Sequence, residues 1–148
     1  MRLTRLRSAA LAVVVAGMAA CSGTDSLVGS NNGAFNSIGA TFTLDSVNAH
    51  ALPAEMRHDA TGSMSVTKGQ LALAAGSFQQ ILTLSETTAA GSTSTRDAVT
   101  QGTFTIKGEQ IHFQASDGGE WDGTYTGIRI EYSVSGNSGR ITFTFGRH

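Results

Sequence analysis

The chain has one cysteine, few charged residues and no apolar run long enough to cross a membrane. Of its 148 residues one is Cys and 14% are charged, with 10 basic against 11 acidic residues. A single cysteine excludes an intramolecular disulfide and a zinc site built from several thiolates. The near-zero net charge argues against nucleic-acid binding, which is associated with a basic stripe. The apolar fraction of 40% is enough for the core of one domain.

Residues 1–20 have the pattern of a secretory signal. Arg2, Arg5 and Arg7 make a basic start, and an uncharged, mostly apolar run follows from Ala9 to Ala20. This run is shorter than the roughly 20 residues that a spanning helix needs. We therefore predict that residues 1–20 are a cleaved export signal and take no part in the fold.

The residues at the cleavage point resemble a bacterial lipobox, in which a Leu-like residue and two small residues precede a cysteine. Met18, Ala19 and Ala20 stand before Cys21. The resemblance implies cleavage before Cys21 and acylation of its thiol and new amino terminus, which gives a stable lipid anchor in the membrane. Ser22 follows instead of Asp, which favours the outer membrane in a Gram-negative host. The alternative is an ordinary exported protein with a free cysteine.

This interpretation places the protein in the bacterial cell envelope, with its domain in the periplasm or at the cell surface. Residues 21–38 are rich in Ser, Gly and Asn and are predicted to be the lipidated cysteine and a flexible tether. Alternatively, Phe35 and Ile38 belong to a first strand or to a plug in a barrel. Without the signal the chain keeps seven basic and eleven acidic residues, a formal charge of −4.

From residue 39 to residue 148 the sequence alternates between apolar and polar residues. In Thr41–Val47, Phe42 and Leu44 share one face while the threonines share the other, as in a half-buried strand. The same alternation predicts further strands at Gln70–Leu73, Phe78–Ser85, Gly102–Gly108, Ile111–Gln114, Trp121–Tyr125, Ile128–Val134 and Arg140–Phe145. Glycine- and asparagine-containing turns separate these strands.

Two stretches show this alternation only weakly. Ala54–His58 is compatible with one helical turn, and Ala89–Thr95 with a long loop or a hairpin tip.

Roughly eight short strands joined by short connections predict an all-β antiparallel meander over residues 39–148. Closure into a small barrel would remove its exposed edges, so we expect a barrel of about eight strands, with a two-sheet sandwich as the alternative.

The domain resembles the small lipocalin-like domains of bacterial lipoproteins, which begin with a Gly-aromatic strand, a Ser-Val-Asn turn and Leu-Pro and later carry a Gly-Thr-aromatic-Thr hairpin. The matching residues are Gly39, Phe42, Leu44, Ser46, Val47, Asn48, Leu52 and Pro53, then Gly102, Thr103, Phe104, Thr105, Ile106, Gly108, Ile111 and Phe113. The Gly-x-Trp signature of true lipocalins is absent, and the resemblance transfers no activity.

The candidate ligand site consists of aromatic residues on the predicted inner faces. They are expected either to fill the core or to line a small hydrophobic pocket, where the Trp and Tyr polar groups orient a ligand. These residues are Phe42, Phe104, Phe113, Trp121, Tyr125 and Tyr132.

No motif for catalysis or for metal binding is recognisable. The histidines His50, His58, His112 and His148 lack metal-ligand spacing, and there is no Gly-x-Ser-x-Gly elbow. Asp117, Glu120 and Asp122 lack the donor spacing of a calcium loop and are expected at a solvated hairpin tip.

We therefore predict a membrane-anchored lipoprotein that is not an enzyme, needs no cofactor or metal and binds a small apolar ligand in its barrel. The alternative is a structural or protein-interaction module, for example an inhibitor, with a solid core and an unknown partner protein.

Overall fold

The structure is a computed structural model that describes residues 39–136 and 139–148. In these ranges the chain forms ten strands and no helix. In chain order they are β1 (Ala40–Val47), β2 (His50–Ala51), β3 (Ala54–Asp59), β4 (Gly62–Ala74), β5 (Ser77–Thr88), β6 (Thr93–Lys107), β7 (Gln110–Ala115), β8 (Glu120–Tyr125), β9 (Arg129–Gly136) and β10 (Gly139–Gly146).

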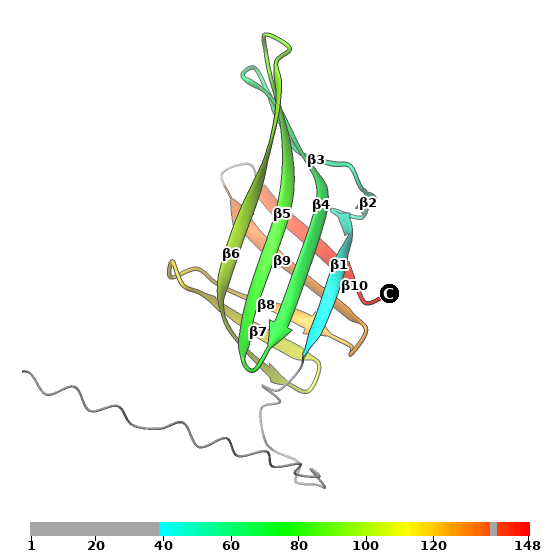
Figure 1. Ribbon diagram of the computed structural model, residues 1–148, viewed down its shortest axis with the longest axis vertical. Coiled ribbons are helices and arrows are strands. Elements are labelled where there is room, and N and C mark those ends of the chain that lie inside the picture. The colour runs from blue at the N-terminus through cyan, green and yellow to red at the C-terminus, as the bar shows by residue number, and fades with distance from the viewer. Residues whose placement is uncertain (1–38, 137–138) are drawn as a thin grey trace, which may run out of the picture. The chain divides into compact units, whose positions relative to one another are not determined.

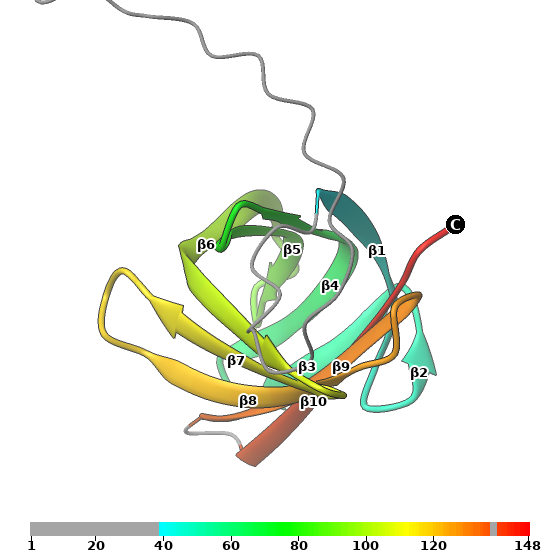
Figure 2. The same ribbon diagram turned by 90° about the horizontal axis from the view of Figure 1, so that it is seen from below.

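Eight of these strands form a closed antiparallel barrel (Figures 1 and 2). From β4 to β10 each strand pairs with the next, and β1 closes the ring because it pairs with both β10 and β4. The two other strands, β2 and β3, pair only with β1 and with β4, respectively. The predicted all-β meander and its closure into an eight-stranded barrel are confirmed, and the sandwich alternative is wrong.

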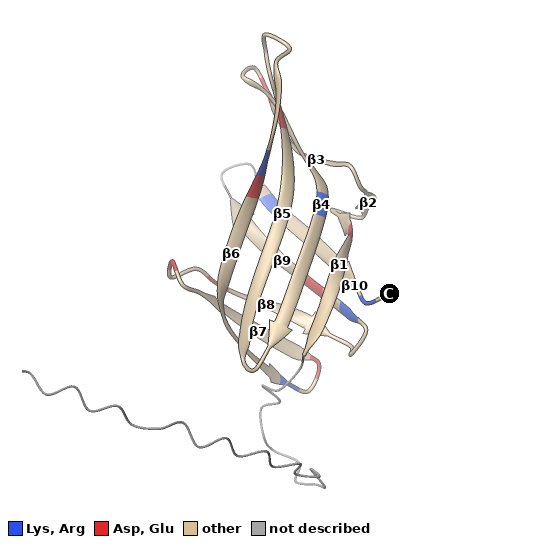
Figure 3. Cartoon of the chain, in the orientation of Figure 1, with Lys and Arg blue, Asp and Glu red and all other residues tan. Residues whose placement is uncertain are grey.

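The alternation in the sequence places one face of every barrel strand inside. Along β5, for example, Phe78, Leu82 and Leu84 are buried while Ser77 and Gln79 are exposed. Phenylalanine, leucine, isoleucine and valine side chains from all barrel strands except β8 form one contiguous core. Charged residues are few along the barrel strands (Figure 3). Burial of the apolar faces, at roughly 25 cal/mol per Å², stabilises the barrel.

Three strands, β4, β5 and β6, extend well beyond the segments that the sequence predicts. β4 begins eight residues before the expected Gln70, and β6 begins at Thr93, within the segment interpreted as a loop or a hairpin tip. The additional parts of β4, β5 and β6 extend beyond the barrel and end in hairpins (Figure 1). Exposed Thr and Ser residues occupy both faces of the extended part of β6, so no apolar alternation marks it.

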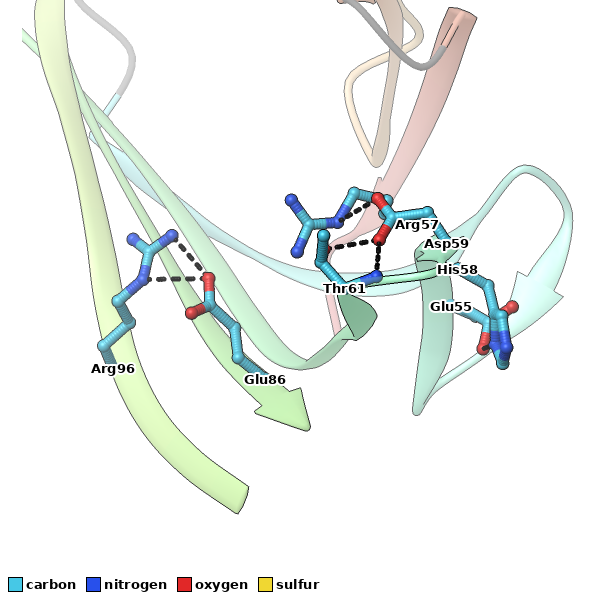
Figure 4. A network of polar contacts seen from close by, with 7 residues as sticks. All are labelled: Glu55, Arg57, His58, Asp59, Thr61, Glu86 and Arg96. Atoms are coloured by element: carbon cyan, nitrogen blue, oxygen red, sulfur yellow. Dashed lines mark hydrogen bonds and ion pairs between the residues drawn. The ribbon is translucent and has the colours of Figure 1, made fainter. Parts of the chain in front are cut away.

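The helical turn suggested for Ala54–His58 is wrong, because this segment is strand β3. It pairs with β4 from Ala54 to Asp59, with a bulge between Glu55 and Arg57. At the following turn, the hydroxyl and the backbone N–H of Thr61 both donate to the Asp59 carboxylate (Figure 4). These hydrogen bonds, the hydroxyl first, lower the pKa of Asp59 below its usual value. Pairing with β4 outweighs the weak helical preference of the segment.

The export signal at residues 1–20, Cys21 and the tether at residues 22–38 lie outside the described residues.

Candidate ligand-binding site

A glutamine lies on the inner, apolar face of β5. Gln80 stands between Phe78 and Leu82 on this face and is 6% exposed. Transfer of an amide from water to an apolar interior is costly unless the amide forms hydrogen bonds. The Tyr132 hydroxyl, from β9, donates a hydrogen bond to the Gln80 Oε1 atom. The bond joins opposite walls of the barrel and leaves the amide N–H groups of Gln80 as the remaining donors of this side chain.

Tyr132 contributes to the site as a neutral hydrogen-bond donor. Its side chain is 3% exposed. Burial raises the pKa of the Tyr132 hydroxyl well above its usual value, and the hydrogen bond to Gln80 opposes this shift only in part. The phenol therefore keeps its proton across the physiological pH range, and its O–H holds the Gln80 amide in one place.

A cavity of about 280 Å³ adjoins the Gln80–Tyr132 pair. Its volume is close to the lower end of the range for small-molecule pockets. Most of its wall is apolar, and its polar side chains are Gln80, Tyr132, Thr100 and Asp117. Thr100 lies directly opposite Gln80 in the β5–β6 pairing, so the two residues place polar groups side by side. The other lining residues are Leu82, Ala115, Gly119, Trp121, Val134 and Phe143.

Trp121, in β8, provides the aromatic part of the wall. Its ring stacks on Phe113 at 5.5 Å, meets Phe78 edge-on at 5.7 Å and lies 5.8 Å from the ring of Tyr132. The indole Nε1 atom is buried and has no hydrogen-bond partner among the described residues. An unsatisfied buried donor costs about 1–3 kcal/mol, and a group that accepts a hydrogen bond from the indole N–H would recover this free energy.

The structure brings only two of the six predicted pocket residues, Trp121 and Tyr132, to this cavity. Phe42, Phe104 and Phe113 are fully buried in the core. Tyr125 packs edge-on against Phe42 with ring centres 6.3 Å apart, away from the lining of the cavity. In these four residues the aromatic rings contribute packing.

Gln80 is the residue that the sequence analysis did not single out. The sequence pattern does mark this residue, since Gln80 is the one polar residue on the face of the predicted strand that carries Phe78, Leu82 and Leu84. A polar residue at an inward position indicates a buried hydrogen bond or a ligand contact.

A second hollow, of about 380 Å³, lies on the outer side of the barrel between β1 and β4–β5. Leu44, Leu52 and Ile81 provide its apolar part, and Lys68 lies at its edge. None of its polar side chains is buried, in contrast to Gln80 and Tyr132. The inner cavity is therefore the better candidate for specific recognition.

Three of the four histidines, and the acidic cluster, take part in surface pairs. His112 lies 2.8 Å from Asp122, His148 lies 2.8 Å from Asp45, and His58 lies 3.2 Å from Glu55. Glu120 accepts a hydrogen bond from Gln114, and Asp117 accepts one from the Gly119 amide. Within residues 39–136 and 139–148, no group of three or more His, Cys, Asp or Glu side chains is placed to hold a metal ion.

In the same part of the chain, no helix has the length and apolar character required to span a bilayer. The chain matches no protein-family profile, and neither a curated protein nor a solved structure is significantly similar to it.

Proposed function

We propose that this protein is a cell-envelope lipoprotein whose barrel binds a small, mostly apolar ligand that carries one polar group. The buried Gln80–Tyr132 pair beside the inner cavity is the observation that carries the proposal. A core without a ligand would be more stable with an apolar side chain at this position, since the amide must be desolvated. The pair instead provides a fixed polar contact within an apolar cavity, as small-molecule sites do.

The cavity lining defines the chemistry of the ligand. Its body would contact Leu82, Val134 and Phe143, and its polar group would accept a hydrogen bond from the Gln80 amide. Since none of the described residues that line the cavity is cationic, a neutral acceptor such as a ketone, an ester or an amide fits better than an anion. Asp117 in the lining also disfavours an anionic group.

The ligand site is tested with a neutral naphthyl-ketone dye whose emission depends on its surroundings. The full chain carrying Cys21→Ala is used without detergent. We expect the dye emission to shift to the blue and Trp121 to transfer excitation energy to the dye, because Trp121 lines the cavity. Replacement of Gln80 by Leu should weaken binding at least about tenfold, which corresponds to loss of one hydrogen bond of about 1.4 kcal/mol.

The adjacent Gln79 provides the matched control. It has the same side chain on the exposed face of β5, so Gln79→Leu should leave dye binding unchanged. Thr100→Val is a second cavity variant and is also expected to weaken binding. It tests the site independently in case Gln80→Leu disturbs the fold. Equal affinity in all variants, or no response to a panel of neutral apolar compounds, would contradict the ligand proposal and favour a purely structural or protein-interaction role.

The lipid anchor is supported by the lipobox-like residues Met18-Ala19-Ala20-Cys21. Several acyl groups attached to Cys21 would hold the protein on the membrane more strongly than a single acyl group can. Replacing Cys21 with Ala should move the protein from the membrane pellet to the soluble fraction in the native host, whereas Ser22→Ala should not. Continued pelleting of Cys21→Ala would contradict the anchor and would leave the ligand proposal intact.

A further inference from the structure

One edge of β6 has no neighbouring strand over most of its length in the part of the chain that the structure describes. β6 pairs with β5 from Thr93 to Thr103 but with β7 only from Gly102 to Lys107. Among the described residues, no strand pairs with the second edge of β6 before Gly102. In Figure 1 this part of β6 forms the side of the extended ribbon.

The direction of the backbone groups at this edge follows from two hydrogen bonds. The Phe104 amide donates to the Gly76 carbonyl on the β5 side, and the Ser116 amide donates to the Gln101 carbonyl on the β7 side. Backbone groups alternate along a strand, and the β5–β6 pairing has no register shift. The N–H and C=O groups of even-numbered residues of β6 therefore point to β5, and those of odd-numbered residues point to the opposite edge of β6. Thr95, Asp97 and Val99 therefore direct their N–H and C=O groups to the open edge.

The end strand β3, which pairs with β4, has an open edge that is protected. It is six residues long, contains a bulge between Glu55 and Arg57, and places charged side chains along its length (Figure 4). Natural sheets use bulges, short strands and charges of this kind to prevent association at an edge. The β6 edge has no bulge in either pairing.

The side chains on the β6 edge also favour association. Val99 is 56% exposed and is one of two large apolar residues exposed in the described ranges. The Asp97 carboxylate is held by the Thr83 hydroxyl at 2.8 Å, and Arg96 is paired with Glu86 at 2.9 Å (Figure 4). Both charged residues are thus positioned by β5, and neither pairing crosses the open edge.

We propose that the β6 edge binds an extended peptide segment of a partner protein by strand addition. The outward N–H and C=O groups at Thr95, Asp97 and Val99 have the spacing that an added strand requires. On the outer face, the free carboxylate oxygen of Asp97 selects a basic residue, and Val99 selects an apolar residue two positions away. The segment recognised is therefore one with a basic and an apolar residue separated by a single residue.

A second copy of this chain fits the edge less well. Symmetric pairing of two β6 edges centred on Asp97 would place two carboxylates directly opposite each other, which is destabilising. Pairing centred on Val99 would place the second strand beside Gln101, where Ser116 already bonds to the carbonyl. The Asp97 charge disfavours the first self-pairing and the occupied Gln101 carbonyl the second, so a basic partner segment fits the edge better.

The test uses a displayed library of random ten-residue peptides selected on the full chain. Val99→Pro removes one outward N–H without removing a hydrogen bond to β5, and Val99→Thr is the control that keeps this N–H. We expect selected peptides to contain a basic and an apolar residue two positions apart. Their affinity for the Val99→Thr variant should be within about threefold of that for the unchanged chain. Their affinity for Val99→Pro should be at least about tenfold lower.

Hydrogen exchange locates the contact. In the free chain the amides of Thr95, Asp97 and Val99 should exchange fast, and a bound peptide should slow all three by at least about tenfold. Asp97→Lys should change the selected residue from basic to acidic.

Four results would overturn the proposal: no selected peptide, equal binding to Val99→Pro, protection elsewhere, or protection of these amides already in the free chain by another segment or a second copy. Gln80→Leu should not alter peptide binding, so failure of the ligand proposal and failure of this one can be distinguished.

Discussion

At the scale of single residues, the barrel wall depends on positions where no side chain fits. Gly102 lies in β6 where it pairs with both β5 and β7. A Cβ atom at this position would overlap with the Gln114 carbonyl oxygen and would lie 2.7 Å from the Ala115 Cα atom. These are backbone atoms of the adjacent strand, so they cannot move without disturbing the pairing of β6 with β7.

We expect Gly102→Ala to lower the free energy of unfolding by about 2 kcal/mol or more, because overpacking against a rigid neighbour is destabilising. Urea denaturation followed by circular dichroism measures the change. Gly136→Ala is the control, since a Cβ atom there would meet none of the described atoms within 4 Å. Equal stability of the two variants would contradict the close approach of β6 and β7.

Tyr132 is expected to make the free energy of unfolding depend on pH in the alkaline range. Burial raises the pKa of its hydroxyl in the folded state above the ordinary value of 10.0. The unfolded chain therefore loses this proton first as the pH rises, and the stabilisation present below pH 10 declines above it. Tyr132→Phe should lose this part of the pH dependence, although it also leaves the Gln80 oxygen without its donor. Parallel pH profiles of the two proteins, from urea denaturation between pH 8 and 11, would contradict the assignment.

At the scale of the strands, the important distinction is between the two edges of β6. Ala98 and Val99 are neighbours, but the N–H of Ala98 faces Leu82 of β5 and the N–H of Val99 faces the open edge. The same substitution is therefore expected to have different consequences at the two positions.

Ala98→Pro should lower the free energy of unfolding by about 1–3 kcal/mol more than Val99→Pro, because it leaves a β5 carbonyl without its donor. Thermal denaturation of both variants measures the difference. If Val99→Pro were the more damaging substitution, the orientation assigned to the backbone of β6 would be wrong.

At the scale of the whole molecule, closure of the barrel depends on β1. This strand pairs with β4 near its start and with β10 near its end. Phe42 lies in the part of β1 that pairs with β4 and is completely buried, whereas the adjacent Thr41 is exposed. A strand that completes a ring couples the two halves of the sheet, so the barrel should unfold as one unit.

Phe42→Ala should lower the free energy of unfolding by about 3–5 kcal/mol, as expected for removal of a large core side chain. Thr41→Ala should change it by less than about 0.5 kcal/mol, since it alters only the surface. Trp121 fluorescence and circular dichroism should report the same single transition in urea. Separate transitions for the two signals would contradict closure of the barrel through β1.

The sequence alone determined the fold class. The alternation of Phe42 and Leu44 with threonines, repeated from Phe78 to Leu84 and from Ile141 to Phe145, is a local property that each strand shows independently. Where one face is buried, this period of two also determines which residues enter the core. The extended part of β6 shows no such alternation, because its Thr and Ser residues are exposed on both faces.

Only the tertiary structure decided which of these residues meet. Gln80 and Tyr132 are 52 positions apart, and their contact depends on how the ring of strands closes. The open edge of β6 arises because β7 pairs with only its last six residues. Local alternation assigns a residue to the inner or the outer face, whereas strand length, register and closure decide its neighbours. The candidate ligand site and the proposed peptide site both depend on those neighbours.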